Sequence, residues 1–461
     1  GSQRCGHAEY AMQQNPEDGQ FRNEGGGKHK VDQCYFSTDF LHTEFLMLFG
    51  HLIFEANYGP THLAERVTEG LASGRLTLVS VDPRLSKTGS KSHKWVPIKP
   101  ATDGALIWAM IRWILENERY DKKFMSNANK AAAIADKETC WSNGNYLVQI
   151  EDDGPGDFLR AKDIGDVKEG DIAKVYVAQD GKIIPVIPDD GTNAVDADMF
   201  FQGEIQSKDG KAIRVKSAWQ LIKEYAFSKT FEEWASICGI ETETITWLAK
   251  EFTSHGKKAA ADSHRGTASN AWGTMTTFSL NTLNTLIGNI DWKGGWQKGG
   301  GSWDFKGTKD HQPYSVMAKL HPGSLKPFGI PLSKQCSVRG LGHRDTTYEN
   351  STIFAGYPAK RPWYGPSKWG VYQEAIPAGA EGYPYKLKAL WLACWTTPAA
   401  ANGNAQKIIE ALADVNKMPL LFANDIVIGE SSMYADYIFP DVSYLEELQT
   451  SKWPSSNMPH K

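Results

Sequence analysis

Residues 75–95 read RLTLVSVDPRLSKTGSKSHKW, and this stretch decides the fold. Its apolar first part ends abruptly at Asp82, and Pro83 then leads into a segment of Ser, Thr, Gly, Lys and His. A short apolar run bounded by turn residues predicts a buried strand. Because ligands of parallel sheets bind where the strands end, the polar segment is predicted to form part of a binding edge.

The residues on either side of this strand predict a parallel sheet. EFLMLFG (44–50) is a second apolar run, and PTHLAERVTEGLASG (60–74) between the two runs has helical spacing and a glycine stop. Strand, helix and strand over so short a length form a βαβ unit with a right-handed crossover. VPIKPATDGALIWAMIRWILENERYD (96–121) adds a strand and a helix capped by Thr102 or Asp103, and KKAAADSH (257–264) adds another strand.

Changes in residue pattern and glycine content along the chain predict two domains. Residues from about 140 to 215 alternate polar and apolar side chains around Asp-Gly turns, which predicts a β-hairpin-rich insertion. DWKGGWQKGGGSWDF (291–305) is a glycine-rich break, where we place the boundary. The predicted domains are 1–297 and 298–461; the second is loop-rich over 300–385 and contains a βαβ unit over 386–440.

The second βαβ unit repeats the first. Asp425 ends the run MPLLFAND as Asp82 ends RLTLVSVD, and Ser or Thr, an aromatic residue and Pro follow each acid at nearly equal spacing. Any two βαβ units look somewhat alike, which is the alternative explanation, but the matching polar tails favour a shared function. The predicted fold class is therefore α/β, with two Rossmann-like parallel-sheet domains related by internal pseudo-symmetry.

Each of these acids is suited to a nucleotide. A carboxylate at a strand end can accept hydrogen bonds from ribose hydroxyls or from the N–H edge of a guanine, and loop hydroxyls and amides can hold phosphate. Neither unit contains the GxGxxG fingerprint, which counts against an ordinary NAD enzyme. The sequence thus predicts two nucleotide pockets that a cofactor with two nucleotide arms would fit.

Composition excludes several classes of protein. The 461 residues are 41% hydrophobic and 23% charged, and the net charge of −4 gives no field that would attract nucleic acid or an anionic membrane. No apolar run approaches the ~20 residues of a membrane span. The opening GSQRCGHAEY has no features of a signal peptide, so we expect an interior fragment, or an engineering scar in its first two residues, GS. The 6 cysteines form no CxxC pair, which predicts neither an iron–sulfur nor a zinc site.

Three ordered segments resemble a known family. FLMLFGHLIFEANYGP (45–60), LVSVDPRLSKTGSKSHKWVPIKPATDGAL (78–106) and NDIVIGESSMYADYIFPDVSYLEEL (424–448) resemble the DMSO-reductase family of molybdopterin oxidoreductases. Further segments look closest to the tetrathionate reductase and respiratory arsenate reductase branch: EANYGP, FTSHGKKAAADSHRG, LIGNIDWKGG and YPAKRPW. Members hold molybdenum or tungsten between two molybdopterin guanine dinucleotides. The resemblance implies a catalytic-subunit fragment that binds this bis-dinucleotide cofactor.

The resemblance also implies roles for individual residues. The positions matching the first dinucleotide site are Gly50, Glu55, Asn57, Tyr58, Asp82, Arg84, Ser86, Thr88, Asp103 and Gly266. Those matching the second are Thr396, Asn402, Asp425, Glu430, Ser431 and Asp436. Cys5 is the implied metal ligand, because a thiolate suits a soft, high-valent metal; an inert thiol and Cys34 are the alternatives. Candidates for stabilising the anionic substrate are His264, Arg265, His343 and Arg344.

The family implies a substrate and partners for the whole protein. The substrate would be an inorganic oxoanion (tetrathionate, arsenate, or polysulfide or thiosulfate) reduced in anaerobic respiration on the outer, periplasmic face of the cytoplasmic membrane. An iron–sulfur electron-transfer subunit and a membrane quinol-oxidising subunit would supply electrons. The N-terminal [4Fe–4S] motif and the C-terminal domain that caps the pterins are missing here, which we interpret as truncation.

This chain also departs from the family pattern within the matched segments. His51 stands where relatives commonly carry Asn, and SHKW (92–95) stands where Ala-Asp-Trp is common. The rival hypothesis is a cofactor-free scaffold subunit of a respiratory complex with the same fold. That hypothesis predicts loss of the acids at the pterin site, whereas Asp82, Asp103 and Asp425 are all present.

Overall fold

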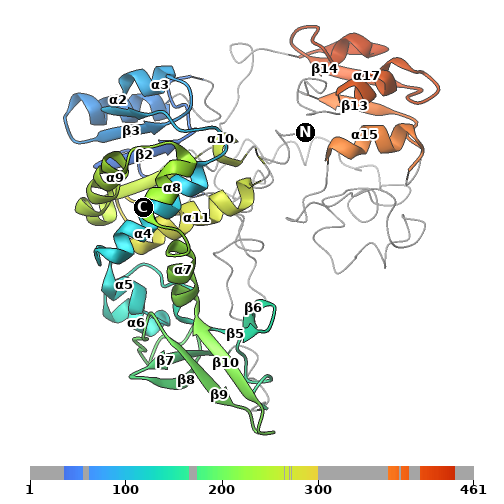
Figure 1. The fold of residues 1–461 in the computed structure, drawn as a ribbon. Helices are drawn as coiled ribbons and strands as arrows, with labels where there is room; N and C mark the ends of the chain where they lie inside the picture. Colours follow the sequence, from blue (N-terminus) through green and yellow to red (C-terminus); the bar gives the residue numbers. More distant parts are fainter. Residues whose placement is uncertain are drawn as a thin grey trace, which may run out of the picture. The chain divides into compact units, whose positions relative to one another are not determined.

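The computed structural model, shown as a ribbon in Figure 1, describes residues 36–55, 62–165, 174–263, 265–268, 270, 272–298, 372–383, 386–393 and 405–441. Most described residues before 299 form one compact unit, here called the first unit, and residues 372–441 belong to a second. The predicted domain boundary after residue 297 adjoins residues outside these ranges, so it stays a prediction.

The first unit is built on a four-stranded parallel sheet. Its strands are β2 (Phe45–Phe49), β3 (Thr77–Val81), β4 (Lys94–Val96) and β11 (Ala259–Ser263), in the order β11-β2-β3-β4. The strands that follow β2 extend the sheet on one side of it, whereas β11 returns to pair on the other side. The chain therefore reverses its direction of winding between β2 and β11, which is where open parallel sheets bind ligands.

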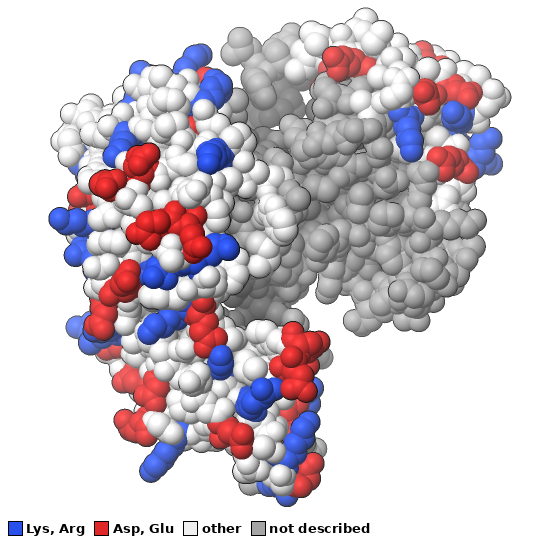
Figure 2. Space-filling view, viewed as in Figure 1, with Lys and Arg blue, Asp and Glu red and all other residues white. Residues whose placement is uncertain are grey.

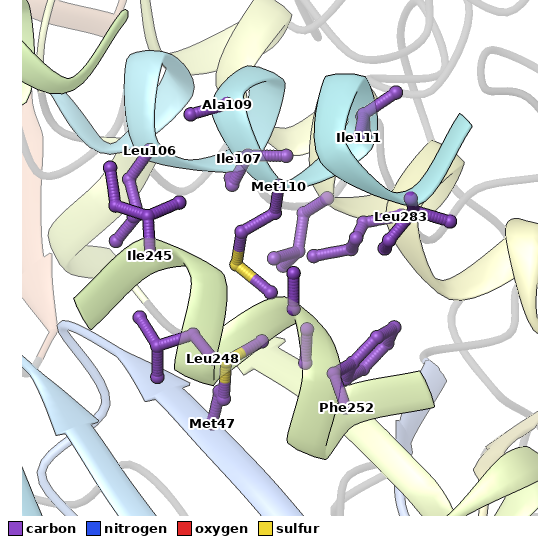
Figure 3. Close-up of a cluster of buried hydrophobic side chains, with 14 of the residues drawn as sticks. Met47, Leu106, Ile107, Ala109, Met110, Ile111, Ile245, Leu248, Phe252 and Leu283 are labelled. Atoms are coloured by element: carbon purple, nitrogen blue, oxygen red, sulfur yellow. The ribbon is translucent and has the colours of Figure 1, made fainter. Parts of the chain in front are cut away.

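Helices cover both faces of this sheet. Alternate β2 residues enter different cores: Phe45, Met47 and Phe49 pack in one, and Leu46 and Leu48 in the other. Figure 3 shows the first core, where Leu106 and Met110 of α4 (Asp103–Glu116) extend towards Ile245 and Leu248 of α9 (Thr242–Ser254). The helices of the unit around the sheet are α2 (His62–Ala72), α3 (Lys87–Lys91), α4 (Asp103–Glu116), α9 (Thr242–Ser254), α10 (Arg265–Ala268) and α11 (Gly273–Leu286).

Side-chain amides pair with the outer edge of β11. Asn284 of α11 accepts from the Ala261 backbone N–H at 3.0 Å and donates to the Ala261 carbonyl at 2.8 Å. Asn289 donates to the Ala259 carbonyl at 2.7 Å and to Asn284 at 2.8 Å. These bonds satisfy buried backbone groups that an edge strand would otherwise leave unpaired.

The remaining strands of the first unit pair in antiparallel fashion. β5 (Leu147–Glu151), β6 (Gly154–Phe158), β9 (Gln202–Gln206) and β10 (Ala212–Ser217) form one sheet in the order β6-β5-β10-β9. β7 (Val175–Gln179) pairs with β8 (Lys182–Val186), and β1 (Phe36–Thr38) with β12 (Trp296–Lys298). The turn between β7 and β8 is Asp180-Gly181, with φ values of +50° and +74°, which suits a two-residue hairpin.

Short helices accompany these strands. Several begin with a side-chain cap, such as the Thr230–Glu233 capping box at the start of α8. Their bounds are α5 (Lys122–Ser126), α6 (Lys130–Ala135), α7 (Ala218–Ala226) and α8 (Phe231–Cys238), with single 3₁₀ turns at Asn143–Asn145 and Gly256–Lys258. On the face in Figure 2, basic and acidic side chains of these segments are interspersed.

The second unit contains a smaller parallel sheet. β13 (Leu390–Ala393), β14 (Leu421–Asp425) and β15 (Tyr437–Pro440) lie in that order, and α17 (Ala405–Ala413) connects the first two. α15 (Tyr372–Ala380) packs with α17 against a core that includes Leu392 and Leu421, and a 3₁₀ turn spans Ser432–Tyr434. The prediction of an α/β fold with parallel sheets is thus confirmed in each unit, and the pseudo-symmetry between them stays a prediction.

Among the described residues, the structure contains no helix of the length and hydrophobicity that a membrane crossing requires.

Candidate functional site

The carboxyl edge of the first sheet gathers the residues predicted for one nucleotide. Gly50 follows β2, Asp82 follows β3, and the chain after β4 leads to Asp103 at the start of α4. Gly266 lies in α10, which follows β11. Because these strands are parallel and in register, their ends and the loops that leave them meet along one edge.

Gly50 and Gly266 contact each other through their backbones at this edge. A Cβ atom on Gly266 would lie 2.8 Å from the Gly50 carbonyl oxygen, and a Cβ on Gly50 would lie 2.9 Å from the Gly266 Cα. Gly50 also has a φ of +55°, and its N–H donates to the Val81 carbonyl at 3.0 Å. Glycine is required at both positions for the chains leaving β2 and β11 to come this close.

Asp82 organises the loop that leaves β3. Its carboxylate Oδ1 accepts from the Arg84 backbone N–H at 2.8 Å, and its carbonyl accepts from Trp95 Nε1 at 2.8 Å. The Arg84 guanidinium is exposed and contacts the Glu55 carboxylate at 2.7 Å. The structure therefore brings together three residues predicted for this site, Glu55, Asp82 and Arg84, across the loops after β2 and β3.

Ser86 and Thr88 have hydrogen bonds within the protein. Ser86 caps α3 by accepting from the Gly89 N–H at 3.0 Å, and Thr88 Oγ1 accepts from the Phe54 N–H at 3.1 Å. Both side chains are buried. They fix the shapes of the two loops that carry Glu55 and Arg84, while a contact of either hydroxyl with ribose or phosphate stays a prediction.

Asp103 is a buried acid, as is Asp82 at the end of β3. It occupies the first turn of α4, where Thr102 is the N-cap residue, and Asp82 and Asp103 are each 8% exposed. Burial raises the pKa of Asp103, and the charge of Asp82 raises it slightly further. A hydrogen bond from its own backbone lowers the pKa, and the net value is about 6. Two buried carboxyls thus belong to one edge of the sheet, and each can accept hydrogen bonds from the N–H donors of a ligand.

A buried histidine–aspartate pair lies at the same edge, and its acid, Asp262, is not among the site residues predicted from the sequence. His51 Nδ1 lies 3.7 Å from Asp262 Oδ1, and Asp262 Oδ2 accepts from the Thr38 backbone N–H at 3.0 Å and from its hydroxyl at 2.7 Å. Burial alone would raise the pKa of Asp262, but His51 and Thr38 outweigh it and the pKa is lowered. The sequence contains a hint of this pair, because Asp262 is a charged residue at the end of the apolar part of the predicted strand KKAAADSH.

In the second unit the structure separates two predicted residues. Asp425 ends β14, and its Oδ2 accepts from Ser432 Oγ at 2.7 Å. Asp436 instead accepts from the N–H of Leu421, the first residue of β14, at 2.8 Å. Asp425 and Asp436 therefore lie at opposite edges of the small sheet, because Asp436 precedes β15 and β15 runs parallel to β14. Ser431 is buried and Glu430 exposed, beside the turn at Ser432–Tyr434.

Several of the predicted site residues lie outside the ranges that the structure describes. The backbone of Arg265 is described within α10, but its side chain is not. The others outside the described residues are Cys5, Cys34, Asn57, Tyr58, His264, His343, Arg344, Thr396 and Asn402. Within the described ranges, His, Cys, Asp and Glu side chains form no group of three or more that could hold a metal ion.

Comparison with known protein families shows to which family the chain belongs. The family profile described as "Molybdopterin oxidoreductase" matches residues 6–451. The chain belongs to the molybdopterin oxidoreductase family. The resemblance seen in the three sequence segments is thereby confirmed over most of the chain.

Curated relatives narrow the comparison within the molybdopterin oxidoreductases. A selenate reductase subunit of Mesobacillus selenatarsenatis is 46% identical over 89% of this chain and 38% of that protein. A tetrathionate reductase subunit of Archaeoglobus fulgidus is 33% identical over 82% of this chain and 32% of that protein. The molybdopterin-containing subunit of arsenate respiratory reductase of a Shewanella strain is 24% identical over 91% of this chain and 38% of that protein. This molybdopterin oxidoreductase chain thus spans about a third of the length of these relatives, from 32% to 38%.

The edge of the first sheet fits the nucleotide part of a molybdopterin cofactor. Gly50 and Gly266 pack backbone to backbone at the switch point, and Asp82 and Asp103 are two buried acids at the same edge. The hydroxyl of Ser263, at the end of β11, is buried without a hydrogen-bond partner among the described residues. A buried hydroxyl of this kind is satisfied when a ligand supplies the missing partner.

Proposed function

We propose that this chain is the dinucleotide-binding part of a molybdopterin oxidoreductase catalytic subunit. In the whole protein it would bind bis-molybdopterin guanine dinucleotide with molybdenum or tungsten and reduce an inorganic oxoanion. The single observation that carries the proposal is that two buried acids, Asp82 and Asp103, both belong to the carboxyl edge of one parallel sheet.

The pair suits guanine among the bases. The N1–H and N2–H₂ groups of guanine are adjacent donors, and two neighbouring carboxylates supply matching acceptors. Hydrogen bonds to the charged form would also lower the pKa of Asp103, which burial has raised. Arg84 and the loop it shares with Asp82 would contact the ribose and the phosphates, and Glu55 would position the Arg84 guanidinium.

The second dinucleotide would occupy the second unit. Asp425 ends the middle strand of that sheet, and Ser432 and the Ile426 backbone N–H hold its carboxylate by hydrogen bonds of 2.7 and 2.9 Å. Thr396, Asn402, Glu430 and Ser431 would complete this site on the family pattern. Asp436 would act from the opposite edge, by fixing β14 against β15, so we do not group it with the residues that bind the ligand.

The metal centre would take its protein ligand from the start of the chain. Cys5 would supply a thiolate, as the family pattern implies. When bound, the molybdenum centre supplies the two-electron redox chemistry. His264, Arg265, His343 and Arg344 would stabilise the negative charge of the oxoanion and of the leaving group, since cationic groups stabilise such charge most in a site that excludes water.

Selenate and tetrathionate are the first substrates to test, because proteins named as their reductases share the highest identities reported above. Arsenate follows, and polysulfide and thiosulfate remain further alternatives. An iron–sulfur electron-transfer subunit and a membrane quinol-oxidising subunit would be the partners, and a [4Fe–4S] cluster would belong to a segment before this chain. The periplasmic face of the membrane is the proposed location, on family analogy alone.

Cofactor analysis of the full-length natural protein tests the proposal. We expect molybdenum or tungsten and, after acid hydrolysis, about two guanine nucleotides per metal, as a bis-dinucleotide cofactor dictates. Reduced viologen should be oxidised on addition of selenate or tetrathionate. Protein without metal and without guanine would contradict the proposal and favour the cofactor-free scaffold subunit.

A further inference from the structure

Aromatic and basic side chains cluster on the outer side of α4, α7 and α8 in the first unit. The three helices contribute to one core (Figure 1). Next to this core the centroids of the Trp108 and Tyr225 rings lie 4.6 Å apart, and those of Tyr225 and Trp234 lie 6.0 Å apart. Tyr225 is 53% exposed and Phe227 36% exposed, although both are large rings. We call the cluster the aromatic–basic surface and define it as Trp108, Arg112, Tyr225, Phe227, Lys229 and Trp234.

Arg112 is held flat against one of these rings. Its Cζ lies 4.3 Å from the centroid of the Phe227 ring, and its Nη1 donates to the Lys229 carbonyl at 3.1 Å. Its Nε is buried without a hydrogen-bond partner in the described part of the chain, where the guanidinium also has no ion pair. The ring and the carbonyl therefore orient a cation whose charge no described carboxylate neutralises.

Lys229 is a second cation of this kind. Its Nζ lies 5.7 Å from the centroid of the Trp234 ring, and it has no ion pair with any described residue. Glu116 of α4 and Glu232 of α8 are exposed acids, but neither forms an ion pair with Lys229 or with Arg112. Two cations thus lie beside exposed rings, each without a carboxylate partner.

This combination suits an acidic segment of another protein chain. Tyr, Trp and Arg contribute most to protein–protein binding when a partner buries them. A stacked guanidinium presents parallel N–H donors that match a carboxylate. The net charge of −4, and the interspersed charges on the face in Figure 2, count against an anionic membrane or a nucleic acid. Carboxylates would meet the cations, and apolar side chains would meet the rings.

We propose that the aromatic–basic surface binds an acidic segment of a partner protein, with a carboxylate on Arg112 and apolar side chains against Tyr225 and Phe227. This surface is separate from the proposed dinucleotide site, because Arg112 lies nine residues after Asp103 along α4, which is about 14 Å of helix. Only a few exposed charges take part, so the association is weak and sensitive to salt.

Fluorescence anisotropy of a labelled peptide tests this binding on the 461-residue chain. The probe is a peptide of three Glu-Leu-Asp repeats, and its neutral match consists of three Gln-Leu-Asn repeats. We expect the acidic peptide to bind and the neutral one to bind at least about tenfold more weakly. The affinity of the acidic peptide should fall between about 50 and about 500 mM NaCl, because salt screens exposed charges.

Variants of the surface separate its two cations from charge elsewhere. Arg112→Gln and Lys229→Gln should each weaken binding about fivefold. Arg112→Lys should weaken it nearly as much as Arg112→Gln, because an ammonium group cannot donate two parallel hydrogen bonds. Lys182→Gln is the matched control: it removes an exposed lysine of β8 that has no ion pair with described residues, and it should leave the affinity unchanged. Urea titration verifies that each variant is folded.

Equal affinities for the acidic and neutral peptides would overturn the inference, as would an unchanged affinity in folded Arg112→Gln. Binding to phosphatidylglycerol vesicles in place of the peptide, lost in the same variants, would make a membrane the occupant and would also overturn it. None of these results bears on the proposed function, because cofactor content does not depend on the aromatic–basic surface.

Discussion

Gly50 and Gly266, more than 200 residues apart in the sequence, contact each other backbone to backbone where β2 and β11 diverge. The contact joins the two loops on either side of the switch point. Side chains of this edge stand directly beside these glycines: His51 follows Gly50, and the Gly50 N–H binds the carbonyl of Val81, which precedes Asp82.

Adding a methyl group at Gly50 should therefore be costly. Gly50→Ala forces a Cβ to 2.9 Å from the Gly266 Cα at a φ of +55°, whereas Gly256 has a φ of +52° with no described atom within 4 Å of its Cβ position. We expect Gly256→Ala to lower the free energy of unfolding by about 1 kcal/mol, and Gly50→Ala by at least about 2 kcal/mol more. Urea titration of both variants measures the difference, and equal losses would show that the contact is unimportant.

Asp103 should make the stability of the ligand-free chain depend on pH. Its folded-state pKa of about 6 lies above the ordinary 3.8, so the native state holds the proton more tightly and stability falls as the pH rises from about 4 to 6. Asp103→Asn removes this cost and should stabilise the chain at pH 8 by up to about 3 kcal/mol, with the gain vanishing near pH 4. Urea titrations at both pH values check the prediction, with exposed Glu65→Gln as control; a gain independent of pH would contradict it.

Binding of guanosine should release protons near pH 6. Donors of the base favour the ionised form of Asp103, so its pKa falls in the complex and affinity rises between pH 5 and 7. Calorimetry in two buffers of different ionisation enthalpy counts the protons. Asp103→Asn should weaken guanosine binding at least tenfold and abolish the proton release, since an amide nitrogen cannot accept a hydrogen bond. Adenosine, which presents a different donor pattern, serves as the control ligand.

Asn284 should be essential to the edge of β11. Asn284→Leu preserves volume but leaves the Ala261 N–H and carbonyl buried without partners, which should cost about 2–4 kcal/mol. Amide exchange of Ala261 should accelerate by a larger factor than that of Met47 in the neighbouring strand. Asn117→Ala, which removes a single exposed hydrogen bond to the Trp113 carbonyl, should cost under about 1 kcal/mol.

Much of the first sheet was predictable because its strands are continuous apolar runs. The runs ending at Gly50, Asp82 and His264 correspond to β2, β3 and β11, and parallel pairing then places Asp82 and Asp103 at one edge. Local sequence could not predict that Thr38 and Asp262 meet, because that contact depends on the return of the chain to the other side of β2.

Asp436 shows a second limit of prediction from sequence. In the sequence it lies close to Asp425, with Ser and Gly between them, and the family pattern assigns both residues to the second dinucleotide site. The chain between them crosses from the carboxyl end of β14 to the amino end of β15, so the residues lie at opposite edges. Spacing along a loop does not reveal such a crossing; only the strand register does.

The central claim is that Asp82 and Asp103 hold the guanine of one arm of a molybdopterin cofactor. An experimental structure of the full-length, cofactor-loaded protein tests it most directly. The account predicts both carboxylates within hydrogen-bonding distance of the N1 and N2 atoms of one guanine, with Asp425 facing the guanine dinucleotide of the other arm. A bound cofactor whose guanines lie away from the carboxyl edge of the β11-β2-β3-β4 sheet would contradict it.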